Sequence, residues 1–388
     1  MNRIVYLDNN ATTPVDPAVS EAMAEFLRTR FGNPSSLYPI GREVKDQINE
    51  AREEVAKVLG AGRSELVFTG SGTEADNFAV LGILDAFPDK KEFITSAIEH
   101  PAIMETGKYL EGKGCRVSYV PVDKTGVIDL DFLRAAVTPR TALVSIMHVN
   151  NEIGTVEPIA QAAEIGHQAG ALFHTDAVQS FGKLPFTVEE LGVDLLSLSA
   201  HKIYGPKGVG ALYIRKGTNI RPFLHGGHQE RGMRAGTENT AGIIGLGRAA
   251  QLLQEKGRED KARIERLADR LKKGIQEHIP KVVFNGHPEL RTKNTLSLLF
   301  LGLEAEAVLL SLATKGICVS TGSACSEESE EVSHVLTAIG LKPEIARSCI
   351  RMSLGRFNIE EDIDITLREL PEIVEKLRKI SDFEPDVD

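Results

Sequence analysis

The chain has 388 residues, 42% of them hydrophobic and 26% charged, so it can bury a large core without disulfides or metals. Its formal net charge of −10 argues against nucleic acid as the main partner, because phosphate binding needs a basic face. The sequence contains neither an apolar run of about 18 residues nor a signal-peptide core, so we expect a cytoplasmic protein with no membrane partner.

Short apolar segments alternate with helical patterns over most of the chain. We expect strands at 65–69, 93–97, 116–120, 142–148, 171–175, 195–199 and 210–215, with helices at 73–87, 101–112, 129–136 and 159–169. Strands this rich in Val, Ile, Leu and Phe are typical of a sheet that is covered on both faces. The alternation therefore predicts an α/β domain with a mainly parallel sheet.

The pattern changes after Gly236. We expect one long helix or two consecutive helices over 239–278, then strands at 282–284 and 296–300, a helix from Glu304, a strand at 349–354 and a final helix from Glu360. This part predicts a smaller α+β domain. We expect residues 15–259 to form the large domain, and residues 1–14 and 260–388 to form the small one.

A glycine-rich turn from Gly70 to Ala75 lies between an expected strand and an expected helix. It fits the dinucleotide fingerprint GxGxxG/A. The same geometry holds any phosphate, because backbone N–H groups and the helix dipole both face the anion. Thr73 and Asp76 also resemble a capping box, so a simple capped turn is the alternative.

Asp176 and Lys202 each follow an apolar strand, at the edge where open α/β sheets bind ligands. The alternatives are that Asp176 caps the next helix and that Lys202 is solvated surface. A partly desolvated lysine at the mouth of a sheet is a candidate Schiff-base nucleophile, because burial lowers the pKa of its amine.

A Gly/Arg/Thr segment from Gly226 to Glu238 precedes the long expected helix. His225, His228 and Glu230 superficially resemble metal ligands, but their spacing matches no standard zinc or iron motif. The segment is better suited to phosphate, and we expect no intrinsic metal site.

The four cysteines form no CxxC pair, and a disulfide framework is not expected in a large cytosolic chain. Cys318 and Cys349 have apolar neighbours and fit buried, inert thiols. Cys325 lies among small polar residues and is the candidate reactive thiol. The acidic residues after Cys325 oppose a thiolate, so its activation must come from a base or cation elsewhere.

Taken together, these segments resemble the cysteine desulfurases of the NifS/IscS kind, within the class V aminotransferase group of pyridoxal-phosphate enzymes. The resemblance runs in order along nearly the whole chain. Besides the Asp176 and Lys202 segments, it is carried by residues 6–13 (YLDNNATT), 31–36 (FGNPSS), 99–101 (EHP), 149–154 (VNNEIG), 234–237 (RAGT), 320–326 (STGSACS) and 351–357 (RMSLGRF). It implies the PLP-dependent transferase (aspartate aminotransferase-like) fold, with seven strands in the large-domain sheet.

The resemblance implies that three residues are catalytic and that two bind the cofactor ring: the catalytic ones are Lys202, His100 and Cys325, and the ring-binding ones are Asp176 and Gln179. Lys202 binds pyridoxal 5'-phosphate covalently. Asp176 pairs with the ring nitrogen, which makes the ring an electron sink, and Gln179 hydrogen-bonds its phenolic oxygen. His100 stacks on the ring and moves protons. Cys325 is the nucleophile that attacks the substrate sulfur.

The resemblance also implies binding roles. Thr237 reaches the cofactor phosphate of the other subunit of a homodimer. Asn151 contacts cofactor and substrate, and Arg356 clamps the substrate carboxylate. The phosphate of the same subunit is bound by Gly72, Thr73, Ser199 and His201.

The implied reaction converts L-cysteine to L-alanine and leaves the sulfur on Cys325 as a persulfide. The sulfur then passes to an acceptor protein, for iron–sulfur cluster assembly or other sulfur-containing products. With an iron–sulfur scaffold as partner, Cys325 could also serve as a transient iron–sulfur ligand. A selenocysteine lyase or another class V enzyme, an NAD-dependent dehydrogenase and a non-catalytic sulfur-assembly scaffold remain alternatives. The acidic stretch after Cys325 leaves the partner preference open.

Overall fold

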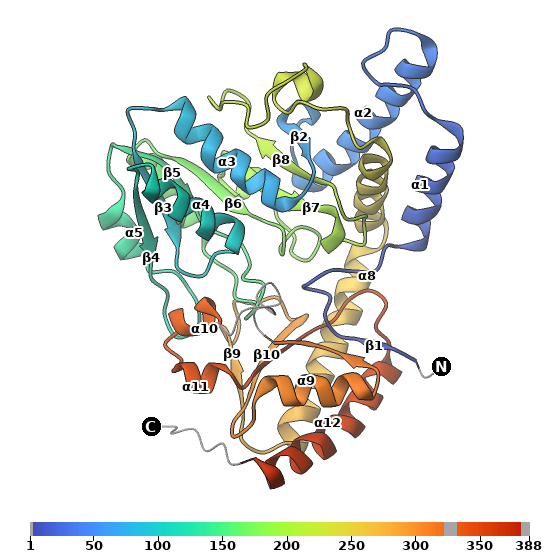
Figure 1. Cartoon of the computed structure of the whole chain (residues 1–388), viewed down its shortest axis with the longest axis vertical. Helices are drawn as coiled ribbons and strands as arrows, with labels where there is room; N and C mark the ends of the chain where they lie inside the picture. Colours follow the sequence, from blue (N-terminus) through green and yellow to red (C-terminus); the bar gives the residue numbers. More distant parts are fainter. Residues whose placement is uncertain (1–2, 322–331, 382–388) are drawn as a thin grey trace.

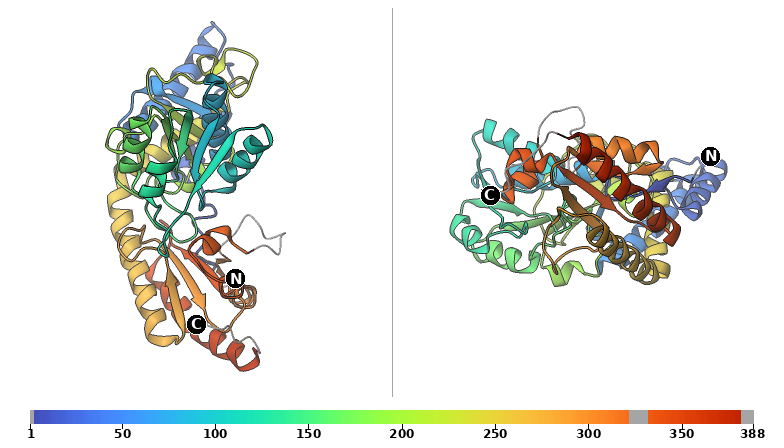
Figure 2. Two further views of the ribbon diagram at one scale, coloured as in Figure 1. Left: turned by 90° about the vertical axis from the view of Figure 1, so that its left-hand side faces the viewer. Right: turned by 90° about the horizontal axis from the view of Figure 1, so that it is seen from below.

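The computed structural model describes residues 3–321 and 332–381, and the predicted nucleophile Cys325 lies outside these described residues. The chain forms two parts, each built around its own sheet (Figure 1). A long helix, α8 (Thr240–His278), runs along one side of both parts (Figure 2). Within the described ranges, no helix is both long and apolar enough to cross a membrane.

The larger part contains a seven-stranded sheet in the order β2-β8-β7-β6-β5-β3-β4. β8 is antiparallel to both its neighbours, and the four pairings from β7 to β4 are parallel. This confirms the predicted α/β class and its mainly parallel seven-stranded sheet. The strands are β2 (Leu66–Thr69), β3 (Glu92–Ser96), β4 (Arg116–Val120), β5 (Thr141–Ser145), β6 (Leu172–Asp176), β7 (Leu195–Ser199) and β8 (Gly210–Ile214).

Helices cover both faces of this sheet, which explains why its strands other than β4 are almost entirely buried. One face packs against α3 (Gly72–Ala86) and α4 (Pro101–Gly112). The other packs against α2 (Pro39–Leu59), α5 (Leu130–Ala136), α6 (Ile159–Gln168), α7 (Val188–Leu191) and the first half of α8. Before α2, helix α1 (Pro17–Thr29) is capped by Asp16, whose side chain accepts from the Ala18 N–H.

The smaller part contains an antiparallel sheet in the order β12-β13-β10-β9. β1 (Val5–Tyr6) pairs in parallel with β11 (Ile317–Cys318), so these two N-terminal residues pack on this part. Cys349 is buried here, and burial raises the pKa of its thiol to about 11. The remaining elements are β9 (Val282–Asn285), β10 (Thr295–Phe300), β12 (Ser320–Thr321), β13 (Cys349–Ser353), α9 (Ala305–Thr314), α10 (His334–Ala338), α11 (Pro343–Ala346) and α12 (Glu360–Ile380).

α8 is one continuous helix that belongs to both cores. Its residues up to Leu252 pack into the core of the larger part, and those from Leu267 pack into the core of the smaller part. The expected domain division at residue 260 falls between these two stretches and stays a prediction.

A buried ion pair anchors the segment that precedes α8. Arg52 on α2 donates to both carboxylate oxygens of Glu230, at 2.6 and 2.7 Å, and the Phe68 N–H donates to the same carboxylate. Both charged side chains are almost inaccessible to water. Glu230 also has a φ of 45°, a costly backbone conformation that this pairing holds in place. Glu230, one of the three residues that superficially resemble metal ligands, therefore forms an ion pair with Arg52.

We expect Arg52→Met to lower the free energy of unfolding by about 3–5 kcal/mol, because the Glu230 carboxylate would stay buried without its counter-charge. Urea denaturation measures this loss. Arg28→Met is the control: it removes an exposed pair with Glu21 and should change stability by less than about 1 kcal/mol. Equal stability of the two variants would contradict the importance of the buried pair.

Candidate active site

A cavity of about 620 Å³ lies at the carboxyl ends of the parallel strands, with part of its wall formed by the smaller part of the chain. This is the edge where open α/β sheets bind ligands. Nine residues predicted from the sequence line it: Gly72, Thr73, His100, Asn151, Asp176, Gln179, Ser199, His201 and Lys202. The structure therefore brings together candidates separated by up to 130 positions in the chain.

Thr237 is not among the residues that line this cavity. It is exposed and lines a second cavity of about 180 Å³ with Gly70 and Asn239. An exposed position leaves its hydroxyl accessible to another molecule, so its predicted contact with a second subunit stays a prediction.

Lys202 lies in a single turn of 3-10 helix (Ala200–Lys202) directly after β7. Its Nζ donates to the backbone carbonyls of Asn10 and Ala11, the latter at 2.7 Å. The N-terminal segment thus holds the amine at the cavity wall, where the sequence predicted a partly desolvated lysine.

Two buried aspartates face the same cavity, Asp176 at the end of β6 and Asp76 on α3. Burial raises the pKa of Asp176 to about 6, while the Val178 N–H and the Lys202 charge favour its ionised form. Burial and the Asp176 charge raise the pKa of Asp76 well above its usual range. A carboxylate held in this way stabilises a cation placed against it, such as a protonated ring nitrogen. The predicted pairing of Asp176 with the ring nitrogen stays a prediction.

The N-terminus of α3 opens into the cavity beside Ser199 and His201. Ser71 caps this helix by accepting from the Glu74 N–H at 3.0 Å, so the expected Thr73–Asp76 capping box was wrong by two positions. A Cβ on Gly72 would lie 2.8 Å from Val178, so glycine is needed for the close approach. Unpaired N–H groups at a helix N-terminus bind an anion such as phosphate.

His100 caps α4 with its imidazole: Nδ1 accepts from the Ala102 N–H at 3.1 Å. Burial and the nearby Lys202 charge lower the pKa of His100 to about 4. The ring is therefore neutral near pH 7, and its proton is on Nε2 because Nδ1 is an acceptor.

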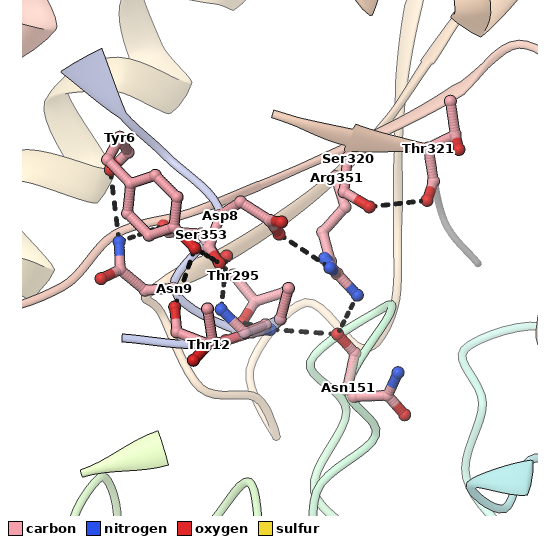
Figure 3. Close-up of polar contacts among 12 residues, drawn as sticks. Tyr6, Asp8, Asn9, Thr12, Asn151, Thr295, Ser320, Thr321, Arg351 and Ser353 are labelled. Atoms are coloured by element: carbon pink, nitrogen blue, oxygen red, sulfur yellow. Dashed lines mark hydrogen bonds and ion pairs between the residues drawn. The ribbon is translucent and has the colours of Figure 1, made fainter. Parts of the chain in front are cut away.

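Arg351 on β13 lines the cavity although the sequence analysis did not select it (Figure 3). Its guanidinium donates to Asp8 Oδ1 at 2.8 Å and to the Asn151 carbonyl at 3.2 Å, and the residue is 1% exposed. A buried guanidinium of this kind is suited to a carboxylate ligand. The alternating pattern of β13 could have indicated this position: Ile350 and Met352 face the core of the smaller part, so Arg351 between them faces the other way.

The structure does not bring Arg356 to the wall of this cavity. Its guanidinium donates to Asp260 at 2.6 Å and to Asp16 at 2.9 Å, and it stacks 4.4 Å from the centre of the Tyr204 ring. The guanidinium of Arg356, which the resemblance assigns to the substrate carboxylate, is therefore already paired with two carboxylates of the protein and stacked on a tyrosine ring.

The sequence analysis also missed two buried glutamates at the cavity. Glu152 accepts from the Ser333 hydroxyl at 2.6 Å, and burial raises the pKa of its carboxyl group to about 7. Glu99 accepts from Ser96 Oγ and the Met147 N–H through Oε1. Its Oε2 has no hydrogen-bond partner in the described part of the chain, and burial raises its pKa to about 8.

Comparisons with known proteins agree with this geometry. The family model "Aminotransferase class-V" matches residues 5–366. Cysteine desulfurase IscS of Methanosarcina thermophila is 51% identical, over 99% of this chain and 95% of that protein. A solved NifS-like protein superposes with a TM-score of 0.91 at 42% identity, covering 97% of this chain and all of the other. The solved structure of SspA in complex with cysteine gives a TM-score of 0.82 at 37% identity, covering 91% and 99%.

The chain therefore belongs to the class-V aminotransferase family and, within it, to the cysteine desulfurases of the NifS/IscS kind. This membership removes the support for the nicotinamide-dependent alternative, because the Gly70–Ala75 turn is accounted for by the N-terminus of α3 at the cavity.

Glu99→Gln should stabilise the cofactor-free protein at pH 8.5 by about 2–4 kcal/mol and have little effect near pH 4.5. Glutamine mimics the protonated acid: it keeps Oε1 as acceptor and carries no charge. Because the folded-state pKa is raised, the wild-type carboxyl contributes fully below about pH 4.5, and its contribution is lost as the pH rises toward 8. Urea denaturation of both proteins across this range measures the difference. Parallel stability profiles would contradict the raised pKa.

Proposed function

We propose that this protein is a pyridoxal-phosphate-dependent cysteine desulfurase that converts L-cysteine to L-alanine. The observation that carries the proposal is the cavity that unites Lys202, Asp176 and His100, in a chain whose relatives bear that name. Pyridoxal phosphate, when bound, supplies an electron sink for bond breaking next to the substrate amine.

The cavity residues fit this cofactor at both of its ends. The N–H groups at the start of α3, with Thr73, Ser199 and His201, suit its phosphate. The carboxylate of Asp176 suits a protonated ring nitrogen, and its pKa is raised because burial outweighs the support that the Val178 N–H and the Lys202 charge give to the anion. Lys202 supplies the amine for covalent attachment, and Gln179 an amide N–H for the phenolic oxygen.

For the substrate, we propose that Arg351 takes the role expected of Arg356. Arg351 faces the cavity and holds the Asn151 carbonyl, so its guanidinium and the Asn151 amide are available to one carboxylate. His100 is neutral with its proton on Nε2, so this N–H can donate a hydrogen bond to the bound substrate.

Sulfur transfer uses a protein thiol. The Cys325 thiolate attacks the sulfur of the bound cysteine; an S–S bond forms as the C–S bond breaks, and its electron pair stays on the substrate carbon. Protonation of that carbon gives alanine, and Cys325 keeps the sulfur as a persulfide. We further propose that an acceptor protein then takes this sulfur, and that a homodimer supplies Thr237 to the opposite cofactor phosphate.

Cys325→Ser should take up pyridoxal phosphate with the wild-type absorption spectrum but form neither alanine nor sulfide from L-cysteine, because a serine hydroxyl is scarcely ionised near neutral pH. Lys202→Ala should lose the absorption of the attached cofactor as well as turnover. Cys349→Ser is the matched control and should retain turnover. Normal desulfuration by Cys325→Ser would contradict the mechanism.

Arg351→Gln should raise KM for L-cysteine about 10- to 100-fold, the loss expected for charge-assisted hydrogen bonds to a carboxylate. Arg356→Gln should leave KM near the wild-type value and lower the melting temperature, because Asp16 and Asp260 lose their counter-charge. Steady-state kinetics and thermal unfolding of both variants decide between the two arginines. A high KM in Arg356→Gln alone would restore the role predicted from the sequence.

A further inference from the structure

A second lysine, Lys183, stands directly behind the cofactor-facing residues. Lys183 lies four residues after Gln179, in the turn that follows β6. In this turn the Lys183 and Leu184 N–H groups both donate to the Ser180 carbonyl. Residues four apart in such a turn lie on the same side, so the backbone brings the two side chains together. Lys183 Nζ donates to Gln179 Oε1 at 2.6 Å and to Asn10 Oδ1 at 2.9 Å.

Lys183 is costly to keep in this position. Its amine is surrounded by protein, and the charged groups that act on it, Lys202 and Arg351, are both cations. Burial and these two charges lower the pKa of Lys183 well below its usual range. The amine has N–H donors for both of the amide oxygens that accept from it.

These bonds fix the direction of the Gln179 amide. Lysine nitrogen donates here and the Asn10 carbonyl only accepts, so Gln179 Oε1 must face Lys183 and Nε2 must face Asn10. The bond to Asn10, at 2.9 Å, uses one of the two hydrogens on Nε2. Gln179 lines the cavity beside Asp176 and Lys202, so the other hydrogen is available to a ligand there.

We propose that Lys183 is a positioning residue for the cofactor site, which holds Gln179 so that its Nε2 donates a hydrogen bond to the phenolic oxygen of pyridoxal phosphate. The inference rests on the proposed function. Without Lys183, Gln179 can turn, and the hydrogen bond to the phenolic oxygen is lost. The oxygen then holds its proton more tightly, because a donor favours the anionic form.

The test is the pH dependence of the visible absorption of the cofactor-loaded protein. In Lys183→Met the midpoint of this titration should rise by about one pH unit relative to the wild type. Lys183→Gln can keep one donor for Gln179 Oε1 and should shift the midpoint less, in the same direction. Lys90→Met is the matched control: this half-buried lysine also donates to two oxygens, of Gly170 and Thr141, away from the cavity. Its midpoint should equal that of the wild type.

A double substitution distinguishes positioning from a direct effect. Gln179→Leu should raise the midpoint by itself, and Lys183→Met added to Gln179→Leu should produce no further rise if Lys183 acts through Gln179. Two shifts that add would overturn the positioning role. If Lys183→Met does not fold, a wild-type midpoint in Lys183→Gln overturns the inference.

The same measurements distinguish this inference from the proposed function. A wild-type protein that takes up no pyridoxal phosphate, judged by absorption after dialysis, overturns both. A wild type that binds the cofactor normally, together with an unshifted Lys183→Met, overturns the inference alone.

Discussion

Every polar atom of Asn10 is hydrogen-bonded, and these bonds join the two parts of the chain at Lys202. Its carbonyl accepts from Lys202 and Gln179, on the sheet side. Its backbone and side-chain nitrogens donate to Ser353 and Thr295 of the smaller part, and to the Asn151 carbonyl. A buried polar group left without partners costs about 1–3 kcal/mol. The site geometry and the docking of the smaller part therefore depend on one residue of the N-terminal segment.

Burial also determines the protonation states of the titratable side chains that line the cavity. Burial raises the pKa values of Glu99 and Glu152 and lowers those of His100 and His201 to about 4. Acids and bases alike are driven toward their neutral forms, so few charges remain to compete with a ligand. Asp176, with a pKa of about 6, stays more acidic than either glutamate because the Val178 N–H and Lys202 support its anion. An ion entering the cavity would therefore meet few fixed charges, each with a defined position.

Local sequence predicted most of this architecture, and the reasons are physical. Short segments rich in Val, Ile, Leu and Phe, alternating with helical patterns, predicted the seven strands of the large sheet and helices between them, because a strand buried on both faces needs apolar side chains on both. Asp176 and Lys202 were selected because each ends such a strand. Contacts between distant segments left no local signal. Asp76 resembled a capping residue, and Arg356 was preferred to Arg351 although the burial of Ile350 and Met352 directs Arg351 to the cavity. The role of Cys325 stays a prediction, since it lies outside the described residues.

The segment RMSLGRF contains two arginines, Arg351 and Arg356, and the sequence does not say which of them faces the cavity. Their positions depend on how the two parts of the chain pack together. Arg356 pairs with Asp16, which caps α1, and with Asp260, in the middle of α8. Its backbone N–H also donates to the Tyr204 hydroxyl at 2.6 Å. Tyr204 has a φ of 66° and lies two residues after Lys202, so a strained turn beside this lysine is braced from the smaller part. Arg356 thus braces the turn that follows Lys202, while Arg351 is the arginine of this segment that lines the cavity.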